Sequence, residues 1–268
     1  MKHSYPEIRK LCLKPDEAIK PIYARYVTHT FSTLLIWLIQ NLSISPNMIT
    51  FMSLAVALTA ILFFIDMTPV SVLIGALLIE IYYILDAVDG QWARLKNTKS
   101  LTGAFFDYLV NYAIQPPLLF AISWGIFLQT KIIWFVLFGF IAAFSTLWVI
   151  LMWDLRASIL LARRSAPEQE PFKMTPQEKP EDQNATSIFR RAFGWLHKAT
   201  VFPWLMNVLT LTSIASLTCS WIFNSQQIVT IFFAILILFY GIFGPVVAVA
   251  LTARWILTRT LDSFHVST

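Results

Sequence analysis

The chain has 268 residues, of which 57% are hydrophobic and 13% are charged, and its formal net charge is +5. Soluble domains carry about 25% charged residues, so this composition excludes an ordinary soluble protein and predicts a polytopic membrane protein. Basic residues in cytoplasmic loops explain the positive charge, and no nucleic-acid partner is needed for it. The two cysteines, Cys12 and Cys219, lie in different settings and suggest neither a disulfide framework nor a zinc site.

The first 46 residues are expected to form a cytoplasmic segment that ends in a short apolar helix. Residues 1–26 are polar and basic and lack the early apolar core of a cleavable signal peptide. Thr28–Leu42 is apolar but shorter than the roughly 20 residues that a span requires. We therefore expect a helix in the membrane interface, with a full span as the alternative. Ser45, Pro46 and Asn47 are typical of a helix start and predict a new helix there.

Six transmembrane helices are predicted after this segment, which makes the chain an all-α polytopic membrane protein with one membrane domain. Residues 47–162 are expected to hold the first four spans and the catalytic motif, and residues 201–268 the last two spans and a tail. The second and fourth helices exceed the hydrocarbon thickness and are expected to extend into the cytoplasm. The predicted spans are Asn47–Ile65, Pro69–Leu95, Gly103–Leu128, Lys131–Ala162, Val201–Phe223 and Ile228–Leu257.

Loop charges predict the orientation of the chain in the membrane. Arg94, Lys96 and Lys99 follow the second span, and residues 163–200, which contain further basic residues, follow the fourth. The opposite loops are short and hold one basic residue between them. By the positive-inside rule, both termini and the active site are expected in the cytoplasm, in a bacterial inner membrane. Residues 163–200 are polar and rich in proline, and we expect a disordered cytoplasmic linker.

Acidic residues interrupt the apolar pattern near the end of the second predicted span. On a helix, Asp89, Gly90 and Ala93 lie about −60°, +40° and −20° around the axis from Asp86, so these four residues share one face. Gly90 and Ala93 have little or no side chain, so a ligand or another backbone can approach this face closely. Arg94 follows at the rim of the same face.

A matching polar stripe is predicted at the start of the third span. Gly103, Asp107 and Asn111 follow one another at intervals of four residues and therefore line one side of a helix. Because the connection Lys96–Thr102 is short, the two helices are expected to be antiparallel neighbours whose polar stripes face each other. The prediction is a small cleft that contains three carboxylates and one amide.

Three carboxylates on facing stripes repel one another and lose solvation, so they must bind cations or stay protonated. The stretch contains neither histidine nor cysteine, and oxygen ligands alone favour Mg²⁺ or Mn²⁺ over zinc. A divalent metal beside Arg94 and a glycine-lined space describes a phosphate or pyrophosphate site. Glu80 lies about 120° around the helix from Asp86, so a simple helix-packing contact explains it equally well and we leave it out of the site.

The order and spacing of these residues resemble the signature of the CDP-alcohol phosphotransferase (CDP-alcohol phosphatidyltransferase) family. An interfacial helix followed by six spans is also the architecture of that family. The upstream Pro46-Asn47-x-x-Thr50 is similar to the helix start on the nucleotide side of the family. The resemblance covers the whole chain and is weakest for residues 1–25 and 163–200. The matching sequence is Asp86-x2-Asp89-Gly90-x2-Ala93-Arg94-x8-Gly103-x3-Asp107-x3-Asn111.

The resemblance implies transfer of a substituted phosphate group from a CDP-alcohol, such as CDP-diacylglycerol, to an acceptor hydroxyl, with release of CMP in phospholipid or related lipid synthesis. It implies two divalent ions, Mg²⁺ or Mn²⁺, held by Asp86, Asp89 and Asp107. It assigns catalysis to Asp107 and to the position of Asn111. Because relatives are commonly homodimers, a homodimer among membrane lipids is expected. The residues implied around the donor nucleotide are Asn47, Thr50, Asp86, Gly90, Ala93, Arg94 and Gly103.

Asn111 departs from the family pattern, in which an aspartate at this position is a metal ligand and the general base. An amide cannot accept the proton of an alcohol, and a positioned base contributes about 10²–10⁴-fold to a rate. Three interpretations follow. Another carboxylate or a substrate phosphate takes the proton in a slower or specialised enzyme; the chain is a catalytically silent relative that binds nucleotide or lipid; or the asparagine is an engineered inactivation. A cation transporter is a further alternative, but it leaves the glycines and Arg94 unexplained.

The acceptor is expected beside the metals, near the cytoplasmic ends of the fourth and fifth spans. Asp154 and Arg156 are candidates to bind a charged acceptor, but two residues apart on a helix they do not share a face. Arg163 and Arg164 are further candidates, and are explained equally well as positive charges that flank a span. Side chains expected only to pack, to lie at the interface or to be solvated are Trp148, Trp153, Trp255, His29 and His197.

Overall fold

The computed structural model describes residues 3–12, 24–165 and 202–257. Within these ranges every regular element is a helix and no strand occurs. Six of the described helices are long and apolar enough to cross a membrane. The predicted all-α polytopic membrane fold is therefore confirmed. Residues 166–200 of the predicted linker, including His197, lie outside the described residues.

The six long helices begin and end within a few residues of their predicted bounds. Ser45 precedes the first of them, and its Oγ accepts a hydrogen bond from the backbone N–H of Met48 at 3.2 Å. Pro46 takes the first helical position, where its missing N–H costs nothing, so the predicted helix start is confirmed. The helices are α3 (Pro46–Asp66), α4 (Pro69–Leu95), α5 (Leu101–Thr130), α6 (Trp134–Ser165), α8 (Phe202–Ile222) and α9 (Gln227–Leu257).

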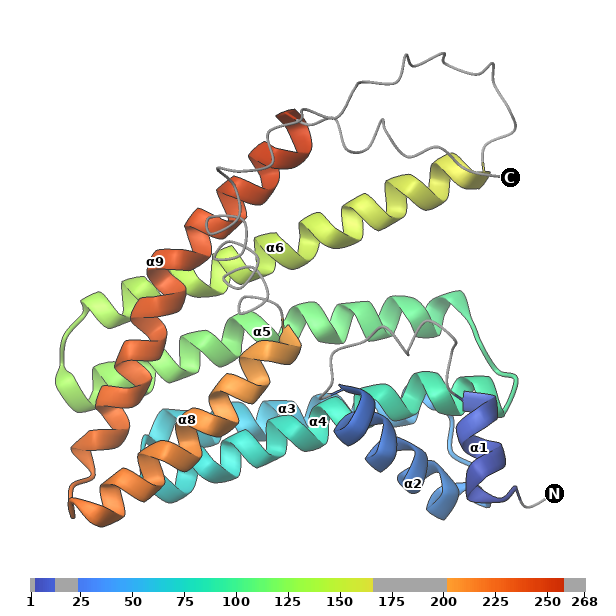
Figure 1. The fold of residues 1–268 in the computed structure, drawn as a ribbon, viewed down its shortest axis with the longest axis horizontal. Coiled ribbons are helices and arrows are strands. Elements are labelled where there is room, and N and C mark those ends of the chain that lie inside the picture. The colour runs from blue at the N-terminus through green and yellow to red at the C-terminus, as the bar shows by residue number, and fades with distance from the viewer. Residues whose placement is uncertain (1–2, 13–23, 166–201, 258–268) are drawn as a thin grey trace, which may run out of the picture.

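The apolar core occupies the half of the bundle that is remote from the α4–α5 connection. Helix α3 packs against α4 and α5, α6 packs against α5 and α9, and α8 packs against α4 and α9 (Figure 1). Phe64 of α3 and Phe233 of α9 are fully buried and meet edge to face, with ring centroids 5.9 Å apart. This core fixes the ends of α4 and α5 that lie away from the acidic residues, and leaves the other ends to form a site.

Two short helices precede the long ones and pack at the end of the bundle where α4 terminates (Figure 1). Helix α2 (His29–Ile39) follows a π-helical turn at Ala24–Thr28. Within the described residues, the apolar stretch Tyr26–Ile39 is shorter than the helices that could cross a membrane, which favours the short-helix prediction over a full span. Helix α1 (Tyr5–Cys12) was not predicted. His29, expected to be interfacial or solvated, is instead buried within the protein, with 6% of its surface exposed.

Candidate functional site

The connection between α4 and α5 reverses the chain within a few residues. Asn97 adopts the left-handed conformation (φ 56°), and the N–H of Thr98 donates to the carbonyl of Ala93 at 3.0 Å. This arrangement ends α4 with satisfied carbonyl groups. Ser100 then caps α5, since its Oγ accepts the N–H of Gly103 at 3.0 Å. The two helices therefore run antiparallel, and their acidic ends lie at the same end of the bundle.

A cavity of about 300 Å³ lies at this end of the bundle, between the starts of α3 and α5 and the end of α4. Asp86 and Asn111 do not line it and lie one helical turn further from the α4–α5 connection. The predicted site residues that line the cavity are Asn47, Thr50, Asp89, Gly90, Ala93, Arg94, Gly103 and Asp107. The lining residues that were not predicted are Pro46, Thr98, Lys99, Ser100 and Ala104.

Asp89 is the most deeply buried carboxylate of the cavity, with 5% of its surface exposed. Its Oδ2 accepts a hydrogen bond from Thr50 Oγ1 at 2.5 Å, which joins α4 to α3. The positive charge of Arg94 also attracts it. The Thr50 hydroxyl and the charge of Arg94 therefore offset in part the loss of solvation that burial imposes on this carboxylate.

Asn111 connects the carboxylates of α4 and α5. Its Nδ2 donates to Asp107 Oδ1 at 3.1 Å and to Asp86 Oδ1 at 3.3 Å, and its Oδ1 accepts from the Tyr82 hydroxyl at 2.7 Å. The polar stripes of the two helices therefore face each other. Tyr82 was missed as part of this network, although it precedes Asp86 by four residues and so lies on the same face of α4.

Two glycines shape the cavity in different ways. A Cβ atom added at Gly103 would lie 3.0 Å from Ser100 Oγ and 3.3 Å from Asn47 Oδ1, so a side chain here would disturb both. At Gly90 the nearest atom is Arg94 Nη1 at 3.7 Å, which leaves open space over this part of α4. Gly103 thus permits close packing of the cavity wall, and Gly90 leaves room for a ligand.

The acidic residues match divalent cations in chemistry, but they are not arranged as a coordination sphere. Across residues 3–12, 24–165 and 202–257, no group of three or more histidine, cysteine, aspartate or glutamate side chains is placed to hold a metal ion. Asp89 is instead bonded to Thr50, and Asp86 and Asp107 to Asn111. These neutral donors leave the mutual repulsion of the carboxylates in place. Since carboxylate oxygens are the ligands that Mg²⁺ and Mn²⁺ prefer, the donor set fits such an ion, which would replace the neutral donors.

The candidate acceptor residues of α6 make contacts between helices. Asp154 accepts a hydrogen bond from the Tyr112 hydroxyl of α5. Arg156 lies over the rings of Trp153 and Trp255, at 5.5 and 5.1 Å from their centroids. The two tryptophan rings meet edge to face at 5.2 Å, as expected for packing.

The remaining sequence candidates lie outside the cavity or outside the described side chains. Trp148, which was also expected to pack, donates to Thr252 of α9 at 3.0 Å. Glu80 accepts from Thr210 of α8 at 2.8 Å, which is the helix-packing contact considered for it. The backbone of residues 163–164 belongs to α6, but their side chains are not among those described.

Comparison with known proteins gives one family and one kind of relative. Residues 43–175 match the model of the CDP-alcohol phosphatidyltransferase family, and this range contains α3 to α6 and all the predicted site residues. Proteins named CDP-diacylglycerol–serine O-phosphatidyltransferase, from Mycobacterium bovis and Mycobacterium tuberculosis, are 36% identical to the chain over 86 residues. The aligned segment covers 31% of this chain and 29% of each relative, so it spans less than a third of the relatives' length.

Proposed function

The chain belongs, through residues 43–175, to the CDP-alcohol phosphatidyltransferase family, and on that premise we propose that it is a multi-pass membrane transferase of phospholipid biosynthesis. It moves a substituted phosphate group from a CDP-alcohol to the hydroxyl group of an acceptor and releases CMP. The observation that carries the proposal is the cavity in which Asp89, Asp107 and Arg94 meet the small residues of the signature. The mycobacterial relatives are named for CDP-diacylglycerol and serine, so these are the first donor and acceptor to test.

The chemistry of the lining residues suits a nucleotide diphosphate. Arg94 and Lys99 line the cavity as positive groups for phosphate oxygens. Gly90 leaves open space beside Arg94. In this proposal the donor nucleotide lies against the residues that the family resemblance assigns to it, which are Asn47, Thr50, Asp86, Gly90, Ala93, Arg94 and Gly103.

The proposal includes divalent ions, Mg²⁺ or Mn²⁺. The family resemblance implies that there are two of them. Asp86, Asp89 and Asp107 would hold these ions, because they are hard oxygen donors that repel one another without a cation. When bound, such ions stabilise the negative charge that develops on the leaving phosphate. Asp107 lines the cavity whereas Asp86 does not, so Asp107 is the carboxylate of the Asn111 network that meets the acceptor hydroxyl. Asn111 positions Asp107 by donating to its Oδ1.

Location and assembly are part of the same proposal. The basic residues after α4 support a cytoplasmic cavity and cytoplasmic termini under the positive-inside rule. Residues 47–162 then form the catalytic part of a single membrane domain, and residues 163–200 form a cytoplasmic linker. A bacterial inner membrane and a homodimer complete the proposal, and the homodimer rests on the family resemblance alone.

The test is CMP release by the purified protein from CDP-diacylglycerol in mixed micelles, with serine, glycerol phosphate or inositol phosphate as acceptors. We expect acceptor-dependent release in MgCl₂ or MnCl₂, loss of release in a chelator, and a decrease of about 10²-fold or more in Asp107→Asn. Glu80→Gln is the matched control, because Glu80 is bonded to Thr210 outside the cavity, and it should retain the activity. Binding of CDP without release from any donor would instead favour the catalytically silent alternative. If the protein neither binds CDP nor releases CMP, that result would contradict both the proposed enzyme and the catalytically silent alternative.

A further inference from the structure

The position of Arg94 depends on helix α1. The Arg94 Nε donates a hydrogen bond to the backbone carbonyl of Cys12, the last residue of α1, at 2.7 Å. At the other end of the guanidinium, Nη1 lies 3.7 Å from the place that a Cβ atom would take at Gly90. One edge of the guanidinium is therefore fixed by α1, and the other reaches the open part of the cavity.

Helix α1 is held on the bundle by apolar contacts. The side chains of Ile8 and Cys12 are fully buried in a cluster that also contains Ile36 of α2 and Val88 and Trp92 of α4. An isolated helix of eight residues is unstable in water. Helix α1 therefore owes its folded state to docking, and the Cys12 carbonyl reaches Arg94 only while α1 is docked.

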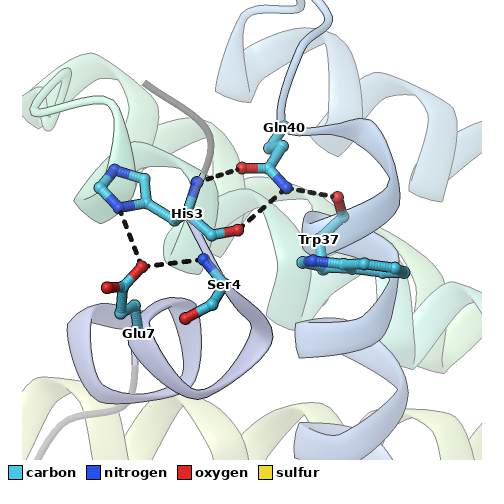
Figure 2. A network of polar contacts seen from close by, with 5 residues as sticks. All are labelled: His3, Ser4, Glu7, Trp37 and Gln40. Carbon is cyan, nitrogen blue, oxygen red and sulfur yellow. Dashed lines mark hydrogen bonds and ion pairs between the residues drawn. The ribbon is translucent and has the colours of Figure 1, made fainter.

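Gln40, just beyond the end of α2, ties the start of the chain to the bundle (Figure 2). Its Oε1 accepts the N–H of His3 at 2.8 Å, and its Nε2 donates to the carbonyls of His3 at 3.3 Å and Trp37 at 2.9 Å. The carbonyl of Gln40 in turn accepts a hydrogen bond from Lys96 Nζ at 3.0 Å, at the end of α4. Gln40 thus links the segment before α1 to the two helices on which α1 docks.

The first turn of α1 is completed by a capping interaction. Glu7 accepts the backbone N–H of Ser4 at 2.8 Å, and its carboxylate lies 3.8 Å from His3 Nδ1 (Figure 2). The hydrogen bond from Ser4 holds the pKa of Glu7 below its usual value. This contact is local to α1, whereas the bonds of Gln40 and Cys12 join α1 to the rest of the molecule.

We propose that α1 is a positioning element of the nucleotide site, in which the Cys12 carbonyl and Gln40 hold the Arg94 guanidinium toward the diphosphate of the donor. Because coupling between two equilibria is reciprocal, a cytidine diphosphate that binds in the cavity also stabilises the docked state of α1. The inference rests on the proposed function, since the ligand is the nucleotide part of the CDP-alcohol. It adds that the amino-terminal segment contributes to donor affinity.

Cys12 supplies a direct readout, because its thiol is buried while α1 is docked. The chain has two cysteines, so Cys219→Ser leaves Cys12 as the single thiol. The rate of its reaction with a soluble maleimide is measured in detergent, with and without CDP and MgCl₂. We expect CDP to slow the reaction about fivefold or more. Gln40→Ala should speed the reaction and weaken CDP binding, measured by calorimetry, by a similar factor.

Two further variants separate positioning from general stability. Arg94→Lys keeps the positive charge but removes the guanidinium bond to Cys12, and CDP at a concentration that saturates this variant should no longer change the labelling rate. Gln129→Ala is the control, because Gln129 Nε2 also donates to a backbone carbonyl, that of Asp66 at 3.5 Å, at the opposite end of the bundle. It should change neither labelling nor CDP affinity.

The outcomes distinguish the inference from the proposed function. If the Cys219→Ser protein binds CDP but the reaction of its Cys12 does not change, the inference is overturned and the proposed function stands. The same holds if Gln40→Ala binds CDP as tightly as the wild type. If the wild type binds no CDP, both are overturned. The effect of CDP on labelling of the Cys219→Ser protein needs no substitution at Gln40, so it decides the question even if Gln40→Ala does not fold.

Discussion

Both ends of the Asn111 amide are occupied by partners within the protein. Its nitrogen faces the carboxylates of Asp86 and Asp107, and its oxygen accepts from the buried Tyr82 hydroxyl. An aspartate at this position would place a third carboxylate beside the other two. Compared with an aspartate, the amide therefore adds no further repulsion in the absence of a cation, and it offers a cation one charged ligand fewer.

We expect Asn111→Asp to make the stability of the protein more dependent on divalent ions. The substitution removes an N–H donor and adds a negative charge next to Asp86 and Asp107, and a divalent ion relieves the added repulsion. Thermal unfolding should show a lower midpoint in chelator than in the wild type and a larger rise on addition of MgCl₂. CMP release should increase by up to about 10²–10⁴-fold where proton removal limits the rate. Asn224→Asp, in the α8–α9 connection, is the charge-matched control. If the wild type, Asn111→Asp and Asn224→Asp all showed the same dependence of the unfolding midpoint on divalent ions, this account would be contradicted.

Gln115 follows Asn111 by one turn of α5 and is fully buried, and within the described part of the chain neither atom of its amide has a hydrogen-bond partner. A buried polar group without a partner costs about 1–3 kcal/mol, so Gln115→Leu should raise the free energy of unfolding by about 1 kcal/mol or more. The matched control is Gln91→Leu, because Gln91 is as buried but donates to Ser32 Oγ at 2.9 Å. That variant should be destabilised. Thermal unfolding in detergent compares the two, and a destabilised Gln115→Leu would show that the amide binds a partner.

At the scale of elements, the long helices follow from the sequence because each is set by local chemistry. A sustained apolar run defines each span, and Ser45 with Pro46 defines the start of α3. Helix α1 could not be predicted in this way. Its eight residues are too few for a periodic pattern, and its stability comes from burial of Ile8 and Cys12 against residues far along the chain.

The same distinction holds within the site. The spacing of Asp86, Asp89 and Asp107 places them on facing sides of two helices because helical periodicity fixes direction. Lys99, by contrast, lines the cavity because the left-handed Asn97 turns the connection toward it, and no periodicity governs a turn. Tyr82 was missed because a tyrosine within an apolar helix has the ordinary appearance of a packing residue.

The α4–α5 connection gives a prediction at this scale. In the left-handed conformation of residue 97, a Cβ atom costs roughly 1–2 kcal/mol, and asparagine and glycine tolerate this conformation best. Asn97→Ala should therefore lower the stability by about 1 kcal/mol, and it should raise the KM for the CDP-alcohol, since Lys99 and Ser100 line the cavity. Asn97→Gly should leave both unchanged. Equal behaviour of the alanine and glycine variants in unfolding and donor kinetics would count against this role of the turn.

At the scale of the whole molecule, the main apolar core and the candidate site occupy opposite halves of the bundle. The fully buried aromatic residues Phe64 and Phe233 lie in the main core, whereas the carboxylates gather where α4 ends and α5 begins. Apolar side chains fill the first half, whereas the second half holds a smaller apolar cluster, which includes Ile8 and Trp92, and a cavity lined by polar side chains and small residues. The carboxylates therefore lie away from the main apolar core.

The loop charges predict which half faces the cytoplasm. With Cys12 and Cys219 replaced by serine, Lys99→Cys and Asn224→Cys each place one thiol at opposite ends of the bundle. Because basic residues follow α4, position 99 should be protected from a membrane-impermeant maleimide in intact cells and position 224 should be labelled. Permeabilised cells, in which both positions should react, provide the control. If only position 99 were labelled in intact cells, the orientation of the chain would be the opposite of the predicted one.

The central claim is that the carboxylates at the α4–α5 connection persist because a divalent ion and a cytidine diphosphate ester bind there. The most direct measurement is a crystal structure with CDP and MnCl₂, in which anomalous scattering identifies manganese. We predict an anomalous peak between Asp86, Asp89 and Asp107, with the diphosphate against Arg94. The claim would be contradicted by CDP bound elsewhere, or by carboxylates that keep their bonds to Thr50 and Asn111 with no manganese between them.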